Sequence, residues 1–290
     1  MSRHFHPLIV KEIRKETADC VSVAFHVPAD LGDQFRFTQG QSLTVRKRFG
    51  NAEIRRSYSI CSSPLEQELR VAIKKQDGGL FSTFANDELR VGDQLEVMPP
   101  VGNFYTPLDP SHRKKYVAIA AGSGITPVIS IIKTTLALEP ESRFTLVYGN
   151  RTKSSVIFRE TIEGLKDRYM SRLQLIFLLS RERTDTPLNS GRIDIEKLQQ
   201  LSAVIDYLAT DDFFLCGPEQ MIFSARDFLA SRGVAEQKIH FELFTTPGEH
   251  PYAGSNQKAT TREPGPESNI TVKLDGISFD FKLPYNGDSI

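Results

Sequence analysis

One stretch decides the fold of the second half of the chain: Tyr116-Val117-Ala118-Ile119-Ala120-Ala121-Gly122-Ser123-Gly124-Ile125-Thr126-Pro127. The apolar run 116–120 predicts a buried strand, and 127–138 predicts a helix. The two glycines between them allow close backbone approach, and we expect Thr126 to cap the helix and Pro127 to begin it. This order favours a nucleotide site, although proline stands where Gly-x-Gly-x-x-Gly has its last glycine.

The same alternation of strand and helix continues on both sides of that turn, from about 113 to 244. Further strands are expected at 144–148, 173–179, 213–216 and 239–243, and further helices at 156–168, 193–201 and 218–231. Repeated strand–helix units predict a doubly wound parallel sheet with helices on both faces. A ligand of such a sheet binds at the carboxyl ends of the strands.

The chain before about residue 110 has a different pattern. Apolar residues alternate over 21–27 and again over 69–73, and glycine, proline and aspartate separate such short pieces. Several short strands with turn signals predict an antiparallel barrel or sandwich. One helix is expected at 80–89, directly after Gly78-Gly79. The fold class is therefore an antiparallel β-barrel followed by an α/β domain.

A third part follows 244. Residues 245–268 contain no Val, Ile, Leu, Met or Phe but four prolines and three glycines, which predicts a linker. Alternation then resumes on both sides of Asp275-Gly276, as in a hairpin. We expect domains at 1–110 and 111–244, a linker at 245–269, and in 270–290 the start of a truncated domain, because a lone hairpin is marginally stable.

Composition excludes several classes of protein. The 290 residues carry 36 basic and 36 acidic side chains, which argues against nucleic acid or an anionic membrane as a partner. No spanning helix and no leader peptide are expected. The three cysteines are too few and too far apart for a disulfide framework or zinc, and the six histidines lack metal spacing. A reducing cytoplasm is the simplest location.

Three further segments carry candidate chemistry. Arg56-Ser57-Tyr58-Ser59 offers a guanidinium for phosphate, hydroxyls for hydrogen bonds and a ring for stacking. Asp77-Gly78-Gly79-Leu80-Phe81-Ser82-Thr83 is a glycine turn before a helix, which suits an anion. Cys216-Gly217-Pro218-Glu219 repeats the strand–turn–helix pattern. Taken singly, these also fit a surface strand with a packed tyrosine, a helix cap, and a small buried cysteine.

In their order, these motifs together with Tyr148-Gly149-Asn150-Arg151 resemble the ferredoxin–NADP reductase superfamily over about 5–244. Within it, the chain is similar to the branch of reductases that serve oxygenases, including those of phenylacetate and aromatic degradation. Members of that group carry a C-terminal plant-type ferredoxin domain with a 2Fe-2S cluster. The linker and hairpin look like the start of such a domain.

The resemblance implies a set of flavin-binding residues. Arg56 would hold the FAD pyrophosphate, Tyr58 would stack on the isoalloxazine, and Ser59 would lie near its N5. The other residues implied on the flavin side are Ser57, Ala72, Ile73, Lys74, Gly78, Gly79 and Ser82, along the ribityl chain and the pyrophosphate. Glu242 would lie near the flavin edge.

The resemblance also implies nucleotide-binding residues. Thr126 would lie between the flavin and the incoming nicotinamide, and Cys216, with Gly217 and Pro218 in its turn, would approach the nicotinamide C4. Gly149, Asn150 and Arg151 would contact the ribose and phosphates, and Ser180 and Arg181 the 2′-phosphate. The implied catalytic residues are Ser59, Cys216 and Glu242.

The implied function is a flavin-dependent NAD(P)H reductase. It would use NADPH, with NADH possible, and pass single electrons to a 2Fe-2S centre, present only in the full-length protein, and on to an oxygenase. A two-domain ferredoxin- or flavodoxin-type reductase is one alternative. A non-catalytic subunit that binds flavin or nucleotide is another.

Overall fold

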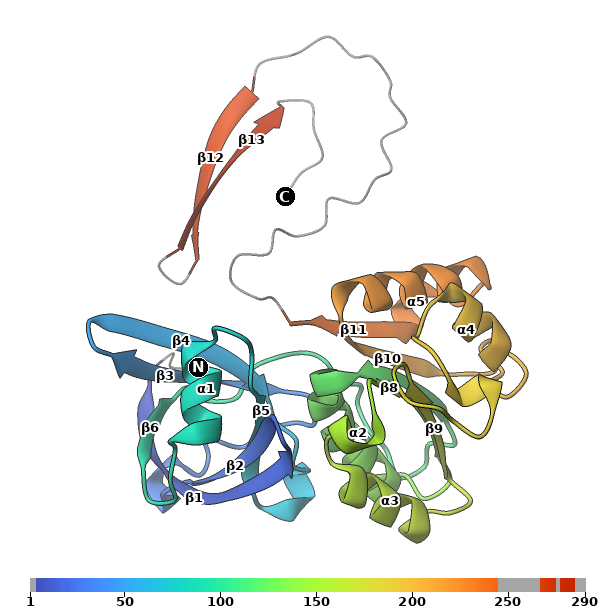
Figure 1. Ribbon diagram of the computed structural model, residues 1–290, viewed down its shortest axis with the longest axis horizontal. Helices are drawn as coiled ribbons and strands as arrows, with labels where there is room; N and C mark the ends of the chain where they lie inside the picture. Colours follow the sequence, from blue (N-terminus) through green and yellow to red (C-terminus); the bar gives the residue numbers. More distant parts are fainter. Residues whose placement is uncertain (1–3, 245–266, 275–276, 285–290) are drawn as a thin grey trace. The chain divides into compact units, whose positions relative to one another are not determined.

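The computed structural model describes residues 4–244, 267–274 and 277–284 (Figure 1). These residues form two separate units, one made of 4–244 and one made of the last two ranges. The first unit contains an antiparallel barrel followed by a parallel α/β domain, as the sequence predicts.

The barrel is a six-stranded antiparallel sheet in the order β4-β3-β6-β1-β2-β5. Its strands are β1 (His6–Thr17), β2 (Cys20–His26), β3 (Ser42–Phe49), β4 (Ala52–Ser59), β5 (Leu69–Lys74) and β6 (Gln94–Val97). Directly after β4, Ile60 forms an antiparallel bridge with Val71 of β5, which joins the two end strands. Helix α1 (Leu80–Asp87) adds Phe81 and Phe84 to the barrel core.

The α/β domain is a five-stranded parallel sheet in the order β11-β10-β7-β8-β9. Its strands are β7 (Lys115–Ala121), β8 (Arg143–Asn150), β9 (Leu173–Leu179), β10 (Asp212–Gly217) and β11 (Ile239–Leu243). Its helices are α2 (Ile125–Leu138), α3 (Arg159–Arg168), α4 (Ile195–Leu201) and α5 (Glu219–Ser231). Helices α2 and α3 share one apolar core with the sheet, and α4 and α5 share the core on its other face.

The topological switch point of the sheet lies between β7 and β10. From β7 the chain proceeds outward through β8 and β9, and then returns to place β10 and β11 on the other side of β7. The turns that follow β7 and β10 begin at Gly122 and Pro218, so both nucleotide-like motifs lie at this point. Open α/β sheets bind ligands at such a crevice.

Two expectations about helix starts are wrong. Thr126 is not an N-cap and Pro127 is not the first helical residue, because a 3₁₀ turn η3 (Gly122–Gly124) precedes α2 and Gly124 occupies the capping position. The helix expected from 156 begins only at Arg159. A separate turn η4 (Lys153–Ser155) comes first, and Phe158 adopts a left-handed conformation with φ of 59°.

The remaining short helices are η1 (Ala29–Leu31), η2 (Pro64–Glu66), η5 (Pro187–Asn189) and η6 (Glu236–Lys238). Helix η2 belongs to a polar contact between the barrel and α2. Ser130 donates to the Ser62 carbonyl at 2.6 Å, and the hydroxyls of Ser63 and Thr134 lie 2.9 Å apart. Lys133 forms an ion pair with Glu66 at 3.0 Å. These bonds fasten the end of the barrel to the first helix of the α/β domain.

The expected C-terminal hairpin is confirmed. Strands β12 (Glu267–Leu274) and β13 (Ile277–Pro284) pair antiparallel, from Leu274 with Ile277 to Glu267 with Pro284. The expected linker at 245–269 falls almost wholly outside the described residues. The domain boundaries, including a truncated domain at 270–290, stay predictions.

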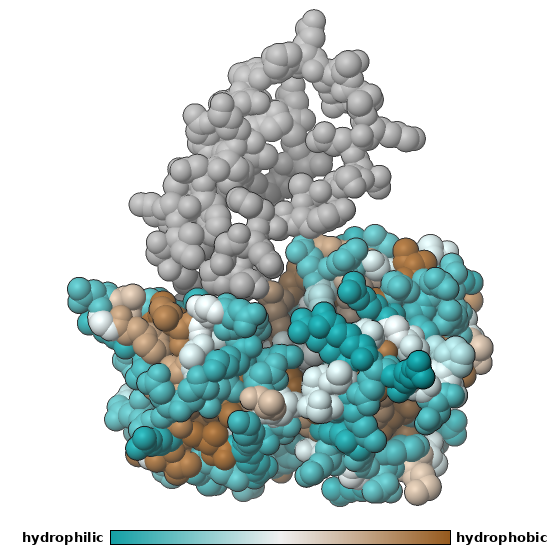
Figure 2. Space-filling model, in the orientation of Figure 1, coloured by the Kyte–Doolittle hydropathy of each residue, from teal (hydrophilic) through white to brown (hydrophobic). Residues whose placement is uncertain are grey.

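The surface of the described residues is mainly hydrophilic on the face shown in Figure 2, with hydrophobic atoms in smaller groups. This agrees with the burial of the apolar side chains in three internal clusters. None of the helices in the described part of the chain has the length and apolar character that crossing a bilayer requires.

Candidate active site

The floor of the site is the contact between the turns after β7 and β10. A Cβ on Gly124 would lie 2.0 Å from the Cys216 carbonyl oxygen, closer than any side chain tolerates. Glycine is therefore required here, because it lets the two turns touch. The Tyr148 hydroxyl supports the same turn from β8 by donating to the Gly122 carbonyl at 3.0 Å. The Thr126 hydroxyl donates to the Ser123 carbonyl at 2.7 Å and so closes the turn.

Cys216 and Glu242 are neighbours across the sheet edge. They are register partners in the parallel pair β10 and β11. The Cys216 side chain is fully buried, and burial raises the pKa of its thiol well above the ordinary value, with the nearby Glu242 carboxylate adding to the effect. Cys216 is therefore a neutral thiol of small volume, not a thiolate nucleophile.

Glu242 also links the α/β domain to the barrel. The Ser59 hydroxyl, at the end of β4, donates to Glu242 Oε2 at 3.2 Å. Ser59 is only 4% exposed, so this hydroxyl lies inside the protein. Burial raises the pKa of Glu242 to about 7, and the Ser59 hydrogen bond opposes that rise. Three implied catalytic residues, Ser59, Cys216 and Glu242, thus lie in one cluster.

The remainder of the Arg-x-Tyr-Ser motif lies along β4. The Tyr58 ring lies 5.7 Å from the Phe81 ring of α1, and burial raises the pKa of its hydroxyl. The Ser57 hydroxyl lies 3.1 Å from the Thr44 hydroxyl on the exposed side of the strand. Arg56 donates to its neighbour's carbonyl, Arg55, at 2.7 Å. Tyr58 and Ser59 therefore project from one short segment to different surroundings.

The glycine turn before α1 is held by Ser82. Its hydroxyl accepts from the Gln76 amide at 3.0 Å and donates to the Gly79 carbonyl at 3.1 Å, so it shapes the turn. Gly78 has φ of 70°, and a Cβ there would meet no described atom within 4 Å. The turn therefore presents bare backbone and the free first-turn amides of α1.

The neighbouring strand β5 supplies three more of the implied residues. Ala72 and Ile73 are buried, and the Ile73 carbonyl accepts from the Asn86 side chain of α1 at 3.0 Å. Lys74 lies at the end of the strand, where its ammonium pairs with Asp19 at 3.5 Å. The α1 turn and the end of β5 are thereby joined.

The ends of β8 and β9 form the other side of the site. The Ser180 amide donates to the Asn150 carbonyl at 3.0 Å, and the Arg181 amide donates to the Arg151 carbonyl at 2.8 Å. Both arginine side chains are exposed. Asn150 is 8% exposed, and its side-chain nitrogen has no hydrogen-bond partner among the described residues. A buried donor of this kind is expected to meet a ligand or water.

Gly149 and Gly217 fit closely into these strand ends. A Cβ on Gly149 would lie 3.0 Å from Ile193 Cδ1, and one on Gly217 would lie 2.8 Å from Met221 Cε. Pro218 then occupies the capping position of α5. The implied nucleotide residues therefore share one edge of the parallel sheet.

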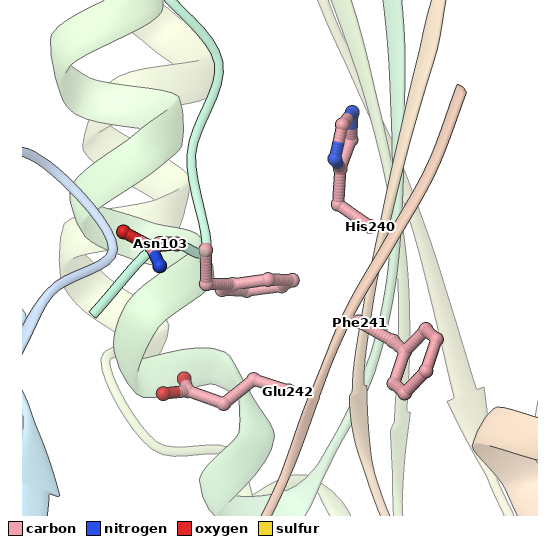
Figure 3. A pocket seen from close by; sticks show the side chains of 5 residues that line it. Asn103, His240, Phe241 and Glu242 are labelled. Atoms are coloured by element: carbon pink, nitrogen blue, oxygen red, sulfur yellow. The ribbon is translucent and has the colours of Figure 1, made fainter. Parts of the chain in front are cut away.

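Sequence reasoning missed the cavity beside Glu242. It has a volume of about 290 Å³ and is lined by Asn103, Phe104, His240, Phe241 and Glu242. Figure 3 shows the side chains of His240 and Glu242 on one side of β11 and Phe241 on the other. The two-residue spacing of His240 and Glu242 is the signal in the sequence, since alternate residues of a strand share a face.

The described residues fit a flavin dinucleotide and a nicotinamide nucleotide. A diphosphate needs a cation and free backbone amides. Arg56 carries such a cation, and the turn at Gly78 presents such amides. A second open turn lies at Gly122, where φ is 54° and a Cβ would meet no described atom within 4 Å. The unpartnered amide of Asn150 and the exposed guanidiniums add donors for a second nucleotide.

Comparison with known families agrees with this geometry. A family model described as an oxidoreductase FAD-binding domain matches residues 7–105, and one described as an oxidoreductase NAD-binding domain matches residues 118–227. The first corresponds to the barrel and the second to the α/β domain. FAD and a nicotinamide nucleotide are thus the cofactors of this chain.

Two solved structures show the same fold at low identity. One is the flavohem-like FAD/NAD-binding domain of nitric oxide dioxygenase from Vibrio cholerae O1 biovar El Tor, with a TM-score of 0.72 and 24% identity over 83% of this chain and 99% of that one. The other is a ferredoxin NADP⁺ reductase from Neisseria gonorrhoeae with bound FAD and NADP, with a TM-score of 0.69 and 19% identity over 83% and 99%.

Two curated relatives are closer in sequence. The chain is 45% identical over 280 residues to one of the subunits of the 1,2-phenylacetyl-CoA epoxidase of Escherichia coli (strain K12), covering 94% of this chain and 79% of the relative. It is 32% identical over 274 residues to the ferredoxin reductase component of 3-ketosteroid-9-alpha-monooxygenase from Rhodococcus rhodochrous, covering 93% and 74%. The chain therefore belongs to the family of FAD- and NAD-binding oxidoreductases that includes these oxygenase components.

Proposed function

We propose that this reductase takes a hydride from NADPH to FAD and sends the electrons singly through a 2Fe-2S centre to an oxygenase that acts in phenylacetate or aromatic degradation. FAD, when bound, supplies the chemistry that converts one two-electron input into two one-electron outputs. The names of the E. coli and Rhodococcus relatives, a component of an epoxidase and a ferredoxin reductase component, support the acceptor class.

The observation that carries the proposal is the cluster of Ser59, Glu242 and Cys216. Ser59 of the FAD-binding barrel donates a 3.2 Å hydrogen bond to Glu242 of the nucleotide domain. Glu242 is in turn the register partner of Cys216 in the neighbouring strand. Hydride transfer depends on holding donor and acceptor in a fixed near-attack geometry. A buried cluster at the junction of two cofactor domains supplies that rigidity.

The barrel residues would bind and orient the flavin. Arg56 and the Gly78-Gly79 turn would hold the pyrophosphate, Tyr58 would stack on the ring system, and Ser59 would offer its hydroxyl to a ring nitrogen. The packing of Tyr58 on Phe81 supports this role, because it fixes the tyrosine ring from one side. Ser57, whose hydroxyl meets Thr44, belongs to the same strand.

The α/β residues would bind the nicotinamide nucleotide. Gly149, Asn150 and Arg151 would contact ribose and phosphates, and the neutral, small Cys216 thiol would leave room for the nicotinamide ring. NADPH is favoured over NADH because Arg151 and Arg181 are adjacent, and guanidinium pairs bidentately with a phosphate. Glu242 would hold or release a proton at its carboxylate near neutral pH.

We place the 2Fe-2S centre in a ferredoxin-like domain of the full-length protein or in a partner. The three cysteines of this chain are free and buried, which leaves no exposed thiolate for a cluster. The hairpin of β12 and β13 would belong to that ferredoxin-like domain. Free thiols also agree with a cytoplasmic location.

The test begins with the purified protein. Flavin released by heat should be FAD and not FMN, and anaerobic NADPH should bleach it. Ser59→Ala should slow the bleaching more than it weakens NADPH binding, whereas Ser231→Ala, a change of the same size at an exposed position at the end of α5, should not. A bound flavin that NADPH fails to reduce would support a non-catalytic binding protein instead.

A further inference from the structure

We propose that the cavity beside Glu242 is a water-filled proton outlet, and that His240, held by Asp212, is the group that passes the proton to bulk solvent. The inference rests on the proposed reductase function. Oxidation of one NAD(P)H by two one-electron acceptors yields NAD(P)⁺, two reduced acceptors and one proton. That proton must leave a site whose hydroxyl, Ser59, is buried.

Glu242 lies between Ser59 and the cavity. One of its oxygens accepts the Ser59 hydrogen bond at 3.2 Å, and the side chain also lines the cavity. Its pKa of about 7 lets it take and give a proton near neutrality. The carboxyl is therefore placed to collect a proton on one side and release it on the other.

The cavity has the size and polarity to hold water. A water molecule occupies about 30 Å³ in the liquid, so a cavity of about 290 Å³ has room for several. Its lining residues include the polar Asn103, His240 and Glu242 beside the aromatic Phe104 and Phe241. Polar walls of this kind hold water, whereas an apolar cavity of equal size stays dry.

His240 is fixed in one orientation. Its Nε2 lies 3.0 Å from Asp212 Oδ1, and its ring stacks on Phe214 with centroids 5.2 Å apart. Asp212 also accepts from the Lys114 ammonium at 3.1 Å, and these two partners lower its pKa although burial opposes them. Asp212 thus remains an acceptor, Nε2 keeps its hydrogen, and Nδ1 is left as the nitrogen that exchanges protons.

Charged and titratable groups of the described residues surround this outlet. His240 faces Asp212 on β10, Lys114 through that aspartate, and Glu242 on its own strand. Glu242 faces the neutral Cys216 thiol and the Ser59 hydroxyl. His240 and Glu242 are alternate residues of β11 that line the same cavity, so water in it can connect the two side chains. His240 acts through Glu242 and is not itself a catalytic residue.

The first test follows proton release directly. NADPH-reduced holoenzyme is mixed with ferricyanide in weak buffer with an indicator dye, and dye and ferricyanide signals are compared. In His240→Gln we expect proton release to lag about tenfold behind electron transfer, and added imidazole to abolish the lag. Equal rates, or a lag that imidazole does not relieve, would overturn the proposal. His26→Gln, an exposed histidine of β2, is the matched control.

The second test needs no turnover. The carboxyl carbon of Glu242 is titrated by NMR in oxidised holoenzyme labelled in glutamate, with Glu242→Gln for assignment. His240→Gln should slow exchange of the Glu242 carboxyl proton with bulk water and broaden the titrating signal near its midpoint, because the group that passes the proton onward is lost. An unchanged line width contradicts the outlet. This result stands even if NADPH does not reduce the flavin, so failure of the outlet and failure of the proposed function are distinguishable.

A second variant tests the water path even if His240→Gln fails to fold. Asn103 is exposed at the cavity wall, so Asn103→Leu is expected to leave the unfolding midpoint unchanged. It should still slow proton release relative to electron transfer, because it replaces a polar wall group. Proton release that keeps pace with electron transfer in this folded variant would count against a water path.

Discussion

Ser59 donates a hydrogen bond of 3.2 Å to Glu242, although 183 residues separate them in the chain. One residue ends a barrel strand and the other lies in the edge strand of the parallel sheet. Both are at least half buried, so the bond is shielded from water and depends on the packing of the two domains. The reactive end of the site is therefore assembled by tertiary structure.

Replacing Glu242 with Gln should flatten the pH dependence of stability. The folded carboxyl titrates at about 7, whereas the unfolded one titrates near 4.5. Between these values the folded state binds more protons, so its free energy of unfolding falls as pH rises, by at most ~1.4 kcal/mol per pH unit. Urea unfolding at about pH 5 and about pH 8 measures this. Glu141→Gln, at an exposed position, should keep the wild-type slope.

Gly124→Ala should destabilise the protein and distort the nucleotide turn. The new Cβ would lie 2.0 Å from the Cys216 carbonyl oxygen, and overpacking of this kind costs about 1–3 kcal/mol. Gly164→Ala is the control, since this glycine lies within α3 with no described atom within 4 Å of a Cβ. It should stabilise by about 0.5–1 kcal/mol. Equal unfolding midpoints for the two variants would contradict the close contact.

Tyr58→Ala should loosen the flavin, because it removes the ring that packs on Phe81. Aromatic stacking contributes about 0.5–1.5 kcal/mol beyond burial, so flavin occupancy after gel filtration should fall. Tyr58→Phe keeps the ring and should retain the flavin. If the alanine variant holds flavin as tightly as the phenylalanine variant, the stacking role is wrong.

Arg181→Ala should weaken NADPH binding by roughly 1.5–3 kcal/mol, the range for a charge-assisted hydrogen bond. NADH kinetics should change little, because NADH lacks the 2′-phosphate. Arg183→Ala, two residues further along an exposed segment, is the control. A parallel loss with both nucleotides would show that Arg181 has a different role.

The 290-residue chain should reduce ferricyanide with NADPH but bind no stoichiometric iron. Cys20, Cys61 and Cys216 lie in three separate strands or turns and are buried, so they cannot supply the four thiolates of a plant-type cluster. Reduction of cytochrome c should be inefficient. Iron and acid-labile sulfide analysis with a visible spectrum is the measurement, and equimolar cluster would refute the expectation.

The sequence predicted the parallel domain well because each strand–helix unit is a local pattern. Its errors are local too. The sequence predicts Thr126 at the capping position of α2, but the 3₁₀ turn at Gly122–Gly124 places Gly124 there. The strand order of the barrel was not predictable, since antiparallel pairing such as β1 with β6 joins distant segments. The cavity was not predictable either. Asn103, which follows the barrel strand β6, and His240 of β11 line it together only in the folded protein.

The serine and threonine contacts between the residues before η2 and helix α2 limit how the chain can be recombined. Ser62 and Ser63 come from the barrel, and Ser130 and Thr134 from the α/β domain, yet they form one set of buried hydrogen bonds. A chimera that takes either half from a distant homologue would inherit donors without acceptors, which is costly inside a protein. We therefore expect a fusion of two cofactor domains to fold well only when the serines of the barrel and the serine and threonine of α2 come from the same parent protein.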